Sequence, residues 1–206
     1  MPTHDDIEIL AREAAYQGYF RIDRYRLRHR LHAGGWSDEM AREVFERGHV
    51  AAVLPYDPDR DQVVLIEQFR IGAHAAGEPA WLTEIVAGVI DKDESAEEVA
   101  RRETREETGC EHLGLRPVLK YLSSPGGSSE TVTLFLGRVD SSKAGGIRGL
   151  ASEHEDIRVF TLPWTEVETG LRAGGFTNAL ALIALQWLAL NRPAARSGWD
   201  RNAAPA

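Results

Sequence analysis

The segment GVIDKDESAEEVARRETREETG, from Gly88 to Gly109, is the part of the sequence that best defines the fold. Ser95, followed three residues later by Glu98, forms a capping box that satisfies the first free N–H groups of a helix. Gly109 suits the left-handed conformation in which helices commonly end. We therefore predict a helix from about Ala96 to Thr108.

This predicted helix carries Glu103, Glu106 and Glu107 on one face, because their spacings are i, i+3 and i+4. Like charges at these spacings destabilise an isolated helix by about 0.2–0.5 kcal/mol per pair. Glu98 and Arg102 offer a compensating i, i+4 pair. The face is then either a solvated, salt-bridged surface or a set of ligands for a hard divalent cation such as Mg²⁺, which binds oxygen ligands.

The composition limits the possible partners. The 206 residues are 43% hydrophobic, enough for one substantial core with a small extension, and the formal net charge is −8. That charge argues against nucleic acid and anionic membranes as partners. Cys110 is the single cysteine, which excludes an intramolecular disulfide and indicates a reducing cytoplasm. No export signal is visible, and the apolar run 179–190 is too short to cross a bilayer.

The organisation of the chain changes near residue 48. Residues 1–48 read as a small β-rich element with alternating apolar residues and arginines, and 39–48 is either a third strand or a short helix. This element has little apolar mass of its own and needs a partner surface. Residues 49–206 begin with a hairpin whose turn is DPDRD and continue as strands mixed with helices, without a repeating βαβ order.

A mixed sheet covered by helices in α/β/α layers is the most economical packing of residues 49–206. The fold class is therefore α/β (α+β), with a small antiparallel β element at the amino terminus. The last residues, from about 192, lose helical periodicity and are expected to form a loosely ordered tail.

The segment around the helix resembles the Nudix box, whose pattern is G-x5-E-x7-R-E-U-x-E-E-x-G-U with U an apolar residue. Gly88, Glu94 and the run RETREETGC from Arg102 match every charged and glycine position. The departures are Thr104, where an aliphatic residue is usual, and Cys110, which is small but apolar. Further matches resemble the ADP-ribose pyrophosphatase branch of Nudix hydrolases. They are Pro125, fifteen residues past Cys110, together with the stretches LTEIVAGVID and GLASEHEDIRV.

The resemblance implies an α/β/α Nudix sandwich and hydrolysis of ADP-ribose to AMP and ribose 5-phosphate with Mg²⁺ or Mn²⁺. The residues it implies for the metal are carboxylates of the box, a loop glutamate and one backbone carbonyl: Glu103, Glu106, Glu107, Glu155 and Ala87. Arg102 and Gly88 would shape the box, and Glu153 would be the general base. Without the resemblance, Glu153 and Glu155 read as an ordinary acidic loop.

Substrate recognition involves residues from both parts of the chain. Arg42 and Arg70 are candidates to bind phosphates, since a guanidinium presents paired donors, although surface salt bridges are an equal alternative. Tyr19 offers a plane for adenine or is a core or interface aromatic, and Glu130 would by resemblance accept from a ribose hydroxyl or help position the loop. The resemblance also implies a homodimer that exchanges its amino-terminal elements.

Three alternatives remain open. Arginines in the amino-terminal element, at positions 21, 24, 26, 28 and 30, could indicate a nucleic-acid-binding module, but the net charge opposes this. The domain could be a catalytically silent nucleotide binder, although such a protein does not need an intact set of metal ligands. Among enzymes, a pyrophosphatase for another nucleoside diphosphate sugar is the closest alternative.

Overall fold

The computed structural model describes residues 6–91, 93–150, 152 and 154–199. The chain divides into two compact units. The smaller unit comprises Met1–His49 with Tyr121–Thr131, and the larger comprises Val50–Lys120 with Val132–Ala206. Among the described residues, no helix is long and apolar enough to cross a membrane.

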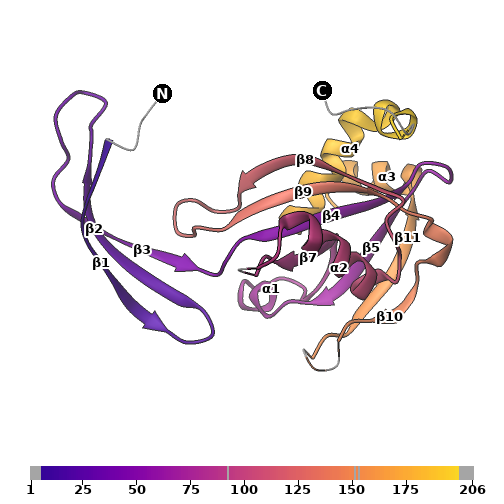
Figure 1. Ribbon diagram of the computed structural model, residues 1–206, viewed down its shortest axis with the longest axis horizontal. Helices are drawn as coiled ribbons and strands as arrows, with labels where there is room; N and C mark the ends of the chain where they lie inside the picture. Colours follow the sequence, from indigo (N-terminus) through magenta and orange to yellow (C-terminus); the bar gives the residue numbers. More distant parts are fainter. Residues whose placement is uncertain (1–5, 92, 151, 153, 200–206) are drawn as a thin grey trace. The chain divides into compact units, whose positions relative to one another are not determined.

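The smaller unit is built on a three-stranded antiparallel sheet of β1 (Ile7–Gln17), β2 (Arg21–His29) and β3 (Met40–Glu46), in that order (Figure 1). The third segment is therefore a strand rather than a helix. Its Phe45 exchanges backbone hydrogen bonds with the segment 121–131, donating to Gly127 and accepting from Ser129. Asp23 is the buried charge of this sheet, and Arg12 and Arg21 pair with it at 2.6 and 2.8 Å.

The larger unit contains a mixed sheet in the order β10-β11-β5-β4-β9-β8, with β6 on β5 and β7 on β4. Its strands are β4 (Val50–Asp57), β5 (Gln62–Phe69), β6 (Trp81–Glu84), β7 (Val86–Val89), β8 (Gly114–Leu122), β9 (Thr131–Arg138), β10 (Gly146–Arg148) and β11 (Ile157–Pro163). The β4–β9 pair is parallel, whereas β4–β5 and β4–β7 are antiparallel. The predicted mixed sheet is thus confirmed.

Helices cover both faces of this sheet. They are α1 (Ile71–Ala75), α2 (Ala96–Thr108), α3 (Trp164–Ala173) and α4 (Ala179–Ser197), with a short 3₁₀ turn η2 (Ser141–Lys143). All eight residues of β4 are buried. Ala51 and Val53 pack against Val99 and Ala100 of α2, so the alternating residues of β4 face the opposite side, where α4 contacts the strand. This arrangement is the predicted α/β/α layering (Figure 1).

The turn DPDRD joins β4 to β5 as predicted, although the two strands pair only at Tyr56–Val63 and Asp57–Gln62. Asp57 stabilises this turn, because its buried carboxylate accepts from the backbone N–H groups of Asp59, Arg60 and Ser141 at 2.9–3.0 Å. Burial alone would raise the pKa of Asp57, but the hydrogen bonds from Arg60 and Ser141 lower it to about 2.

The expectation of a loosely ordered tail from residue 192 is wrong for the residues up to Trp199. Helix α4 continues through Pro193 to Ser197. Tertiary contacts hold this extension: Arg192 Nε donates to Asp61 at 2.9 Å, and Arg196 Nε donates to the Pro58 carbonyl at 3.3 Å. Sequence periodicity could not reveal these partners, since they lie more than 100 positions away.

Candidate functional site: a carboxylate cluster on helix α2

Helix α2 has the boundaries that the sequence predicts. Glu98 N–H donates to Ser95 Oγ at 3.2 Å, and Ser95 N–H donates to Glu98 Oε2 at 2.8 Å, so both halves of the capping box form. Gly109 ends the helix with φ of +73°. Among the described residues, Arg102 pairs with Glu94, Glu103 and Glu106 rather than with Glu98, because the capping box already engages the Glu98 carboxylate.

Glu107 is the most deeply buried carboxylate of the box, at 3% exposure. The backbone N–H of Ala87, on β7, donates to this carboxylate, while Oε2 is buried without a hydrogen-bond partner. Burial raises the pKa of Glu107 well above its usual value. The negative charges of Glu103 and Glu155 add to this effect, and Arg70 opposes it. A buried carboxylate oxygen without a hydrogen-bond partner is costly for a fold to maintain unless something binds it.

Glu103 lies directly against Gly88, which explains the glycine that opens the box. A Cβ on Gly88 would come within 2.1 Å of Glu103 Oε1. Burial raises the pKa of Glu103, and the neighbouring Arg102 partly offsets this effect. The Glu103 side chain can therefore lie in this position because residue 88 has no side chain.

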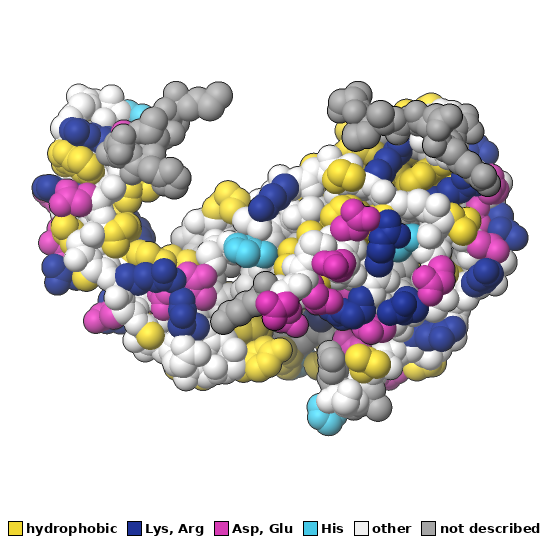
Figure 2. All heavy atoms as spheres, in the orientation of Figure 1, with side chains coloured by type: hydrophobic (Ala, Val, Ile, Leu, Met, Phe, Trp, Pro, Cys, Tyr) yellow, Lys and Arg dark blue, Asp and Glu magenta, His cyan; other side chains and the backbone are white. Residues whose placement is uncertain are grey.

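Arg102 binds three carboxylates at once. Its Nε and Nη2 donate to the two oxygens of Glu94 at 3.0 Å each, and its Nη1 donates to Glu103 at 2.9 Å and Glu106 at 3.1 Å. A planar guanidinium can hold this fork geometry, whereas an ammonium cannot. Figure 2 shows the resulting mixture of acidic and basic side chains over α2. Arg102 thus fixes the direction of two box glutamates.

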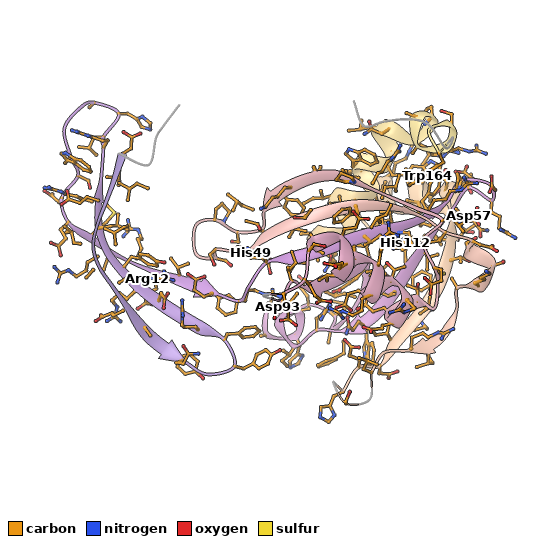
Figure 3. All side chains as sticks on the ribbon, in the orientation of Figure 1. Arg12, His49, Asp57, Asp93, His112 and Trp164 are labelled. Atoms are coloured by element: carbon orange, nitrogen blue, oxygen red, sulfur yellow. The ribbon has the colours of Figure 1, made fainter. Side chains whose placement is uncertain are left out.

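Thr104, which replaces the usual aliphatic residue, is fully buried and has hydrogen-bond partners. Its hydroxyl donates to the Ala100 carbonyl at 2.8 Å and therefore accepts from His112 Nε2 at 2.9 Å. His112 lies beside α2 (Figure 3), and burial lowers its pKa. A Cβ on Gly137 of β9 would meet this ring at 2.3 Å. The departure from the box pattern is accommodated by a hydrogen bond between the buried Thr104 and the half-buried His112.

Glu155 lies in the loop between β10 and β11. Its carboxylate accepts from the Leu150 N–H at 3.1 Å, and its own N–H donates to the Leu150 carbonyl at 3.3 Å. Gly149 packs so closely that a Cβ there would lie 2.6 Å from the Glu155 Cβ. Glu155 acts electrostatically on Glu103 and Glu107, so the loop brings a further carboxylate to α2. Glu153 lies outside the described residues.

Arg70 follows β5 and is positioned by a residue that sequence reasoning missed. Its Nε and Nη2 form a fork with the carboxylate of Glu84, which is 1% exposed. The charges of Glu107 and Glu155 also act on Arg70, so this cation lies near the carboxylate cluster. The signal in the sequence was a lone charged residue inside the apolar run WLTEIV, since such a residue is rarely buried without a partner.

The remaining candidates belong to the smaller unit. Tyr19 is 95% exposed at the turn between β1 and β2, and its ring meets Phe20 edge-on at 4.8 Å. Arg42 lies on β3 and donates to the carbonyl of its neighbour Ala41 at 2.8 Å. Glu130 is buried and pairs with Arg47 at 3.0 Å. Each of these residues is placed only within its own unit.

The carboxylate cluster suits a hard divalent cation by its chemistry. It supplies only oxygen donors, and Glu107 Oε2 is a buried oxygen without a donor. Within the described ranges, however, no three His, Cys, Asp or Glu side chains already converge in a metal-binding arrangement. Arg102 holds Glu103 and Glu106, and Leu150 holds Glu155, so these oxygens would have to turn toward a bound ion.

The architecture and the box define the class of protein. The family model described as NUDIX domain matches residues 46–180, and the chain belongs to the Nudix family. It is 50% identical over 195 residues to the ADP-ribose pyrophosphatase of Escherichia coli (strain K12), covering 95% of this chain and 93% of the relative.

Two further comparisons extend this assignment. The chain is 37% identical over 150 residues to the GDP-mannose pyrophosphatase of Cronobacter sakazakii, covering 72% of this chain and 78% of the relative. A crystal structure described as that of an ADP compounds hydrolase superposes with a TM-score of 0.72, covering 95% of this chain and 100% of that chain. Its sequence identity is 19%, so it supports the fold alone.

Proposed function

We propose that this protein is a Mg²⁺-dependent ADP-ribose pyrophosphatase that releases AMP and ribose 5-phosphate, with Mn²⁺ as a possible substitute. The observation that carries the proposal is the carboxylate cluster, in which Glu103, Glu107 and Glu155 act on one another around an oxygen that has no donor. The half-identical relative from Escherichia coli supports the choice of ADP-ribose.

The residues proposed to hold the metal are Glu103, Glu106, Glu107 and Glu155, with the backbone carbonyl of Ala87. A bound divalent cation would neutralise the pyrophosphate, stabilise the leaving phosphate and lower the pKa of a bound water. Arg102 would keep two of the glutamates oriented toward the ion, since it already contacts both.

Residues beside the cluster are proposed to take the proton from the attacking water and to bind the substrate. Glu153 would take the proton from the attacking water, a role that rests on the family resemblance of the loop. Arg70 would bind a phosphate oxygen, because its guanidinium lies near the cluster and Glu84 engages only its Nε and Nη2. Excess negative charge would otherwise repel the pyrophosphate from this site.

A homodimer with exchanged amino-terminal elements would complete the substrate site. The sheet β1–β3 exposes large apolar side chains, with exposed fractions of 54% for Ile7, 50% for Ile9 and 59% for Tyr16. Contact with a second subunit would remove this apolar surface from water. Tyr19, Arg42 and Glu130 would then contribute base, phosphate and ribose contacts.

Residues 1–48 would be the dimerisation element and 49–206 the hydrolase domain. Deleting residues 1–48 should abolish the dimer in light scattering, and a fully active monomer would contradict this proposal.

The second candidate is hydrolysis of another nucleoside diphosphate sugar, since a relative is named GDP-mannose pyrophosphatase. A catalytically silent nucleotide binder is disfavoured, because a binder has no need for a buried, unpartnered carboxylate oxygen. The acidic net charge of −8 disfavours nucleic acid as a partner. The single cysteine fits a cytoplasmic protein.

Phosphorus NMR of the products distinguishes these functions. ADP-ribose, ADP-glucose, GDP-mannose and ATP are each incubated with the protein, with and without Mg²⁺. The proposal expects AMP and ribose 5-phosphate to form fastest from ADP-ribose, and only with metal. Faster cleavage of GDP-mannose would support the second candidate, and no cleavage with Mg²⁺ or Mn²⁺ would favour the silent binder.

A further inference from the structure

Glu84 is a buried carboxylate that the proposed chemistry does not use directly. Its side chain is 1% exposed, and both of its oxygens accept hydrogen bonds. Arg70 Nε lies 3.1 and 3.2 Å from the two oxygens, Arg70 Nη2 lies 2.8 Å from Oε2, and Asn178 Nδ2 lies 3.0 Å from Oε1. Such a fully bonded carboxylate is rigid, because moving either partner would leave a charge unpaired in the interior.

Asn178 makes two hydrogen bonds that fix its side chain. It is the N-cap of α4, where Oδ1 accepts from the Ala181 N–H at 3.1 Å, and Nδ2 donates to Glu84. The orientation of the amide is unambiguous, since only the oxygen can accept from an N–H and only the nitrogen can donate to a carboxylate. Serine and aspartate cap helices equally well, but neither carries this donor. The choice of asparagine is thus explained by Glu84.

Arg70 keeps part of its guanidinium available. Among the described residues, Glu84 is the one acceptor of its side-chain hydrogen bonds, and these bonds engage Nε and Nη2. An arginine has five N–H donors, so both donors of Nη1 and one of Nη2 remain. They belong to the edge of the guanidinium that can bind two oxygens of one phosphate.

We propose that Asn178 is a positioning residue for substrate recognition: acting through the buried Glu84, it holds Arg70 so that its free edge meets a phosphate of the substrate. The contacts run from the N-cap of α4, through the end of β6, to the residue after β5. This inference rests on the proposed function only for the identity of the substrate. The fixed orientation of Arg70 is a property of the protein without ligand.

The first test measures that orientation without substrate. The Arg70 Nε–H signal is assigned in a nitrogen-15 NMR spectrum from its loss in Arg70→Lys, and its exchange with water is measured. Asn178→Ser retains the helix cap but lacks the donor to Glu84, and Asn178→Asp also places a like charge against it. We expect exchange to be about tenfold faster in Asn178→Ser and faster still in Asn178→Asp. Exchange unchanged in both variants would overturn the inference.

The second test asks whether the orientation matters for the substrate. With ADP-ribose and Mg²⁺, Asn178→Ser should raise KM about fivefold to tenfold with kcat within about twofold, since a contact made in both ground and transition states is weakened. The same change in an Arg70→Ala background should have no further effect on KM. An equal effect in that background would mean that Asn178 acts through stability alone, and would overturn the inference.

Two controls keep the outcomes separate. Asn191→Ser alters another asparagine of α4, whose Nδ2 donates to the Trp187 carbonyl at 2.8 Å and does not contact Glu84, so it should leave both readouts unchanged. Thermal unfolding without ligand checks that each variant is folded.

If wild-type protein does not cleave ADP-ribose, the proposed function fails while the exchange measurement still decides the inference. If wild-type protein cleaves it and the variants match wild type in exchange and KM, only the inference fails.

Discussion

Replacing Glu107 with glutamine should stabilise the metal-free protein while removing its activity. Glu107 is 3% exposed, and its Oε2 is buried without a hydrogen-bond partner. The nearby charges of Glu103 and Glu155 add repulsion. This carboxylate is therefore held at the expense of stability, as expected for a group that is kept for function.

The magnitude follows from the burial of that oxygen. Leaving a buried polar atom without a partner costs about 1–3 kcal/mol. Glutamine keeps an acceptor for the Ala87 N–H, and its neutral amide removes the repulsion from Glu103 and Glu155. We expect a gain of about 1–2 kcal/mol in the free energy of unfolding, which corresponds to a Tm increase of roughly 2–8 °C for a chain of this length.

Activity should change in the opposite direction. Altering residues around metal ligands typically costs about 10–100-fold, so loss of a ligand should lower kcat by more than about 100-fold. Thermal unfolding is measured in EDTA and with added Mg²⁺, beside turnover of ADP-ribose. Mg²⁺ should raise the Tm of wild-type protein, and the rise should be smaller for Glu107→Gln because that variant binds Mg²⁺ more weakly.

Glu97→Gln is the matched control, because Glu97 lies on the same helix in a surface pair with Arg101 at 2.8 Å. It should change stability by less than about 0.5 kcal/mol and leave turnover intact. Full metal-dependent activity in Glu107→Gln would refute the ligand assignment. A variant that is folded but less stable than wild type in EDTA would refute the account of the unpaired oxygen.

Three further changes test other parts of the structure. Asp57 lies at the end of the larger unit away from α1 (Figure 3), and Asp57→Asn should cost about 2–3 kcal/mol at pH 7 without altering turnover, because its lowered pKa reflects stability that charged hydrogen bonds supply. That stability is present above the ordinary pKa of 3.8 and is lost as pH falls toward about 2. Denaturant titrations at several pH values should therefore show wild-type stability falling toward that of the variant over this range, and a pH-independent difference between the two proteins would contradict the prediction. Gly88→Ala should fold but lose metal affinity, measured by calorimetry with Mn²⁺, because its Cβ would displace the Glu103 carboxylate; unchanged affinity would contradict that contact. Glu153→Gln should lower kcat by about 10²–10⁴-fold with little change in ADP-ribose affinity, and an unchanged rate would remove it as the base.

Beside the fold class, the details predicted correctly from the sequence are local ones. The bounds of α2, both halves of its capping box and its left-handed Gly109 follow from residues within one short segment. The same holds for the turn DPDRD, whose Asp57 bonds its own neighbours Asp59 and Arg60. Local hydrogen bonding of this kind is encoded over a few positions, so it can be read without knowing the fold.

One error is local, because the capping box engages Glu98 and leaves it unavailable to Arg102, whereas the others concern contacts outside the local segment. The tail was expected to be loosely ordered, but Arg192 and Asp61 are 131 positions apart and hold it as helix. Thr104 is an unexplained departure from the box until its contact with His112 is seen. A sequence pattern does not predict these pairs, because it does not show which side chains meet in the folded chain.

The sequence by itself determined the family, the helix that carries the box, and which residues are candidates to bind metal and substrate. Only the tertiary structure decided how those residues are held: Glu107 with an oxygen that lacks a donor, Glu103 against Gly88, and Arg70 fixed by Glu84. The physical reason is that residue type sets which chemistry a side chain can perform, whereas burial and the nearest charges set whether it is paired, oriented or left free.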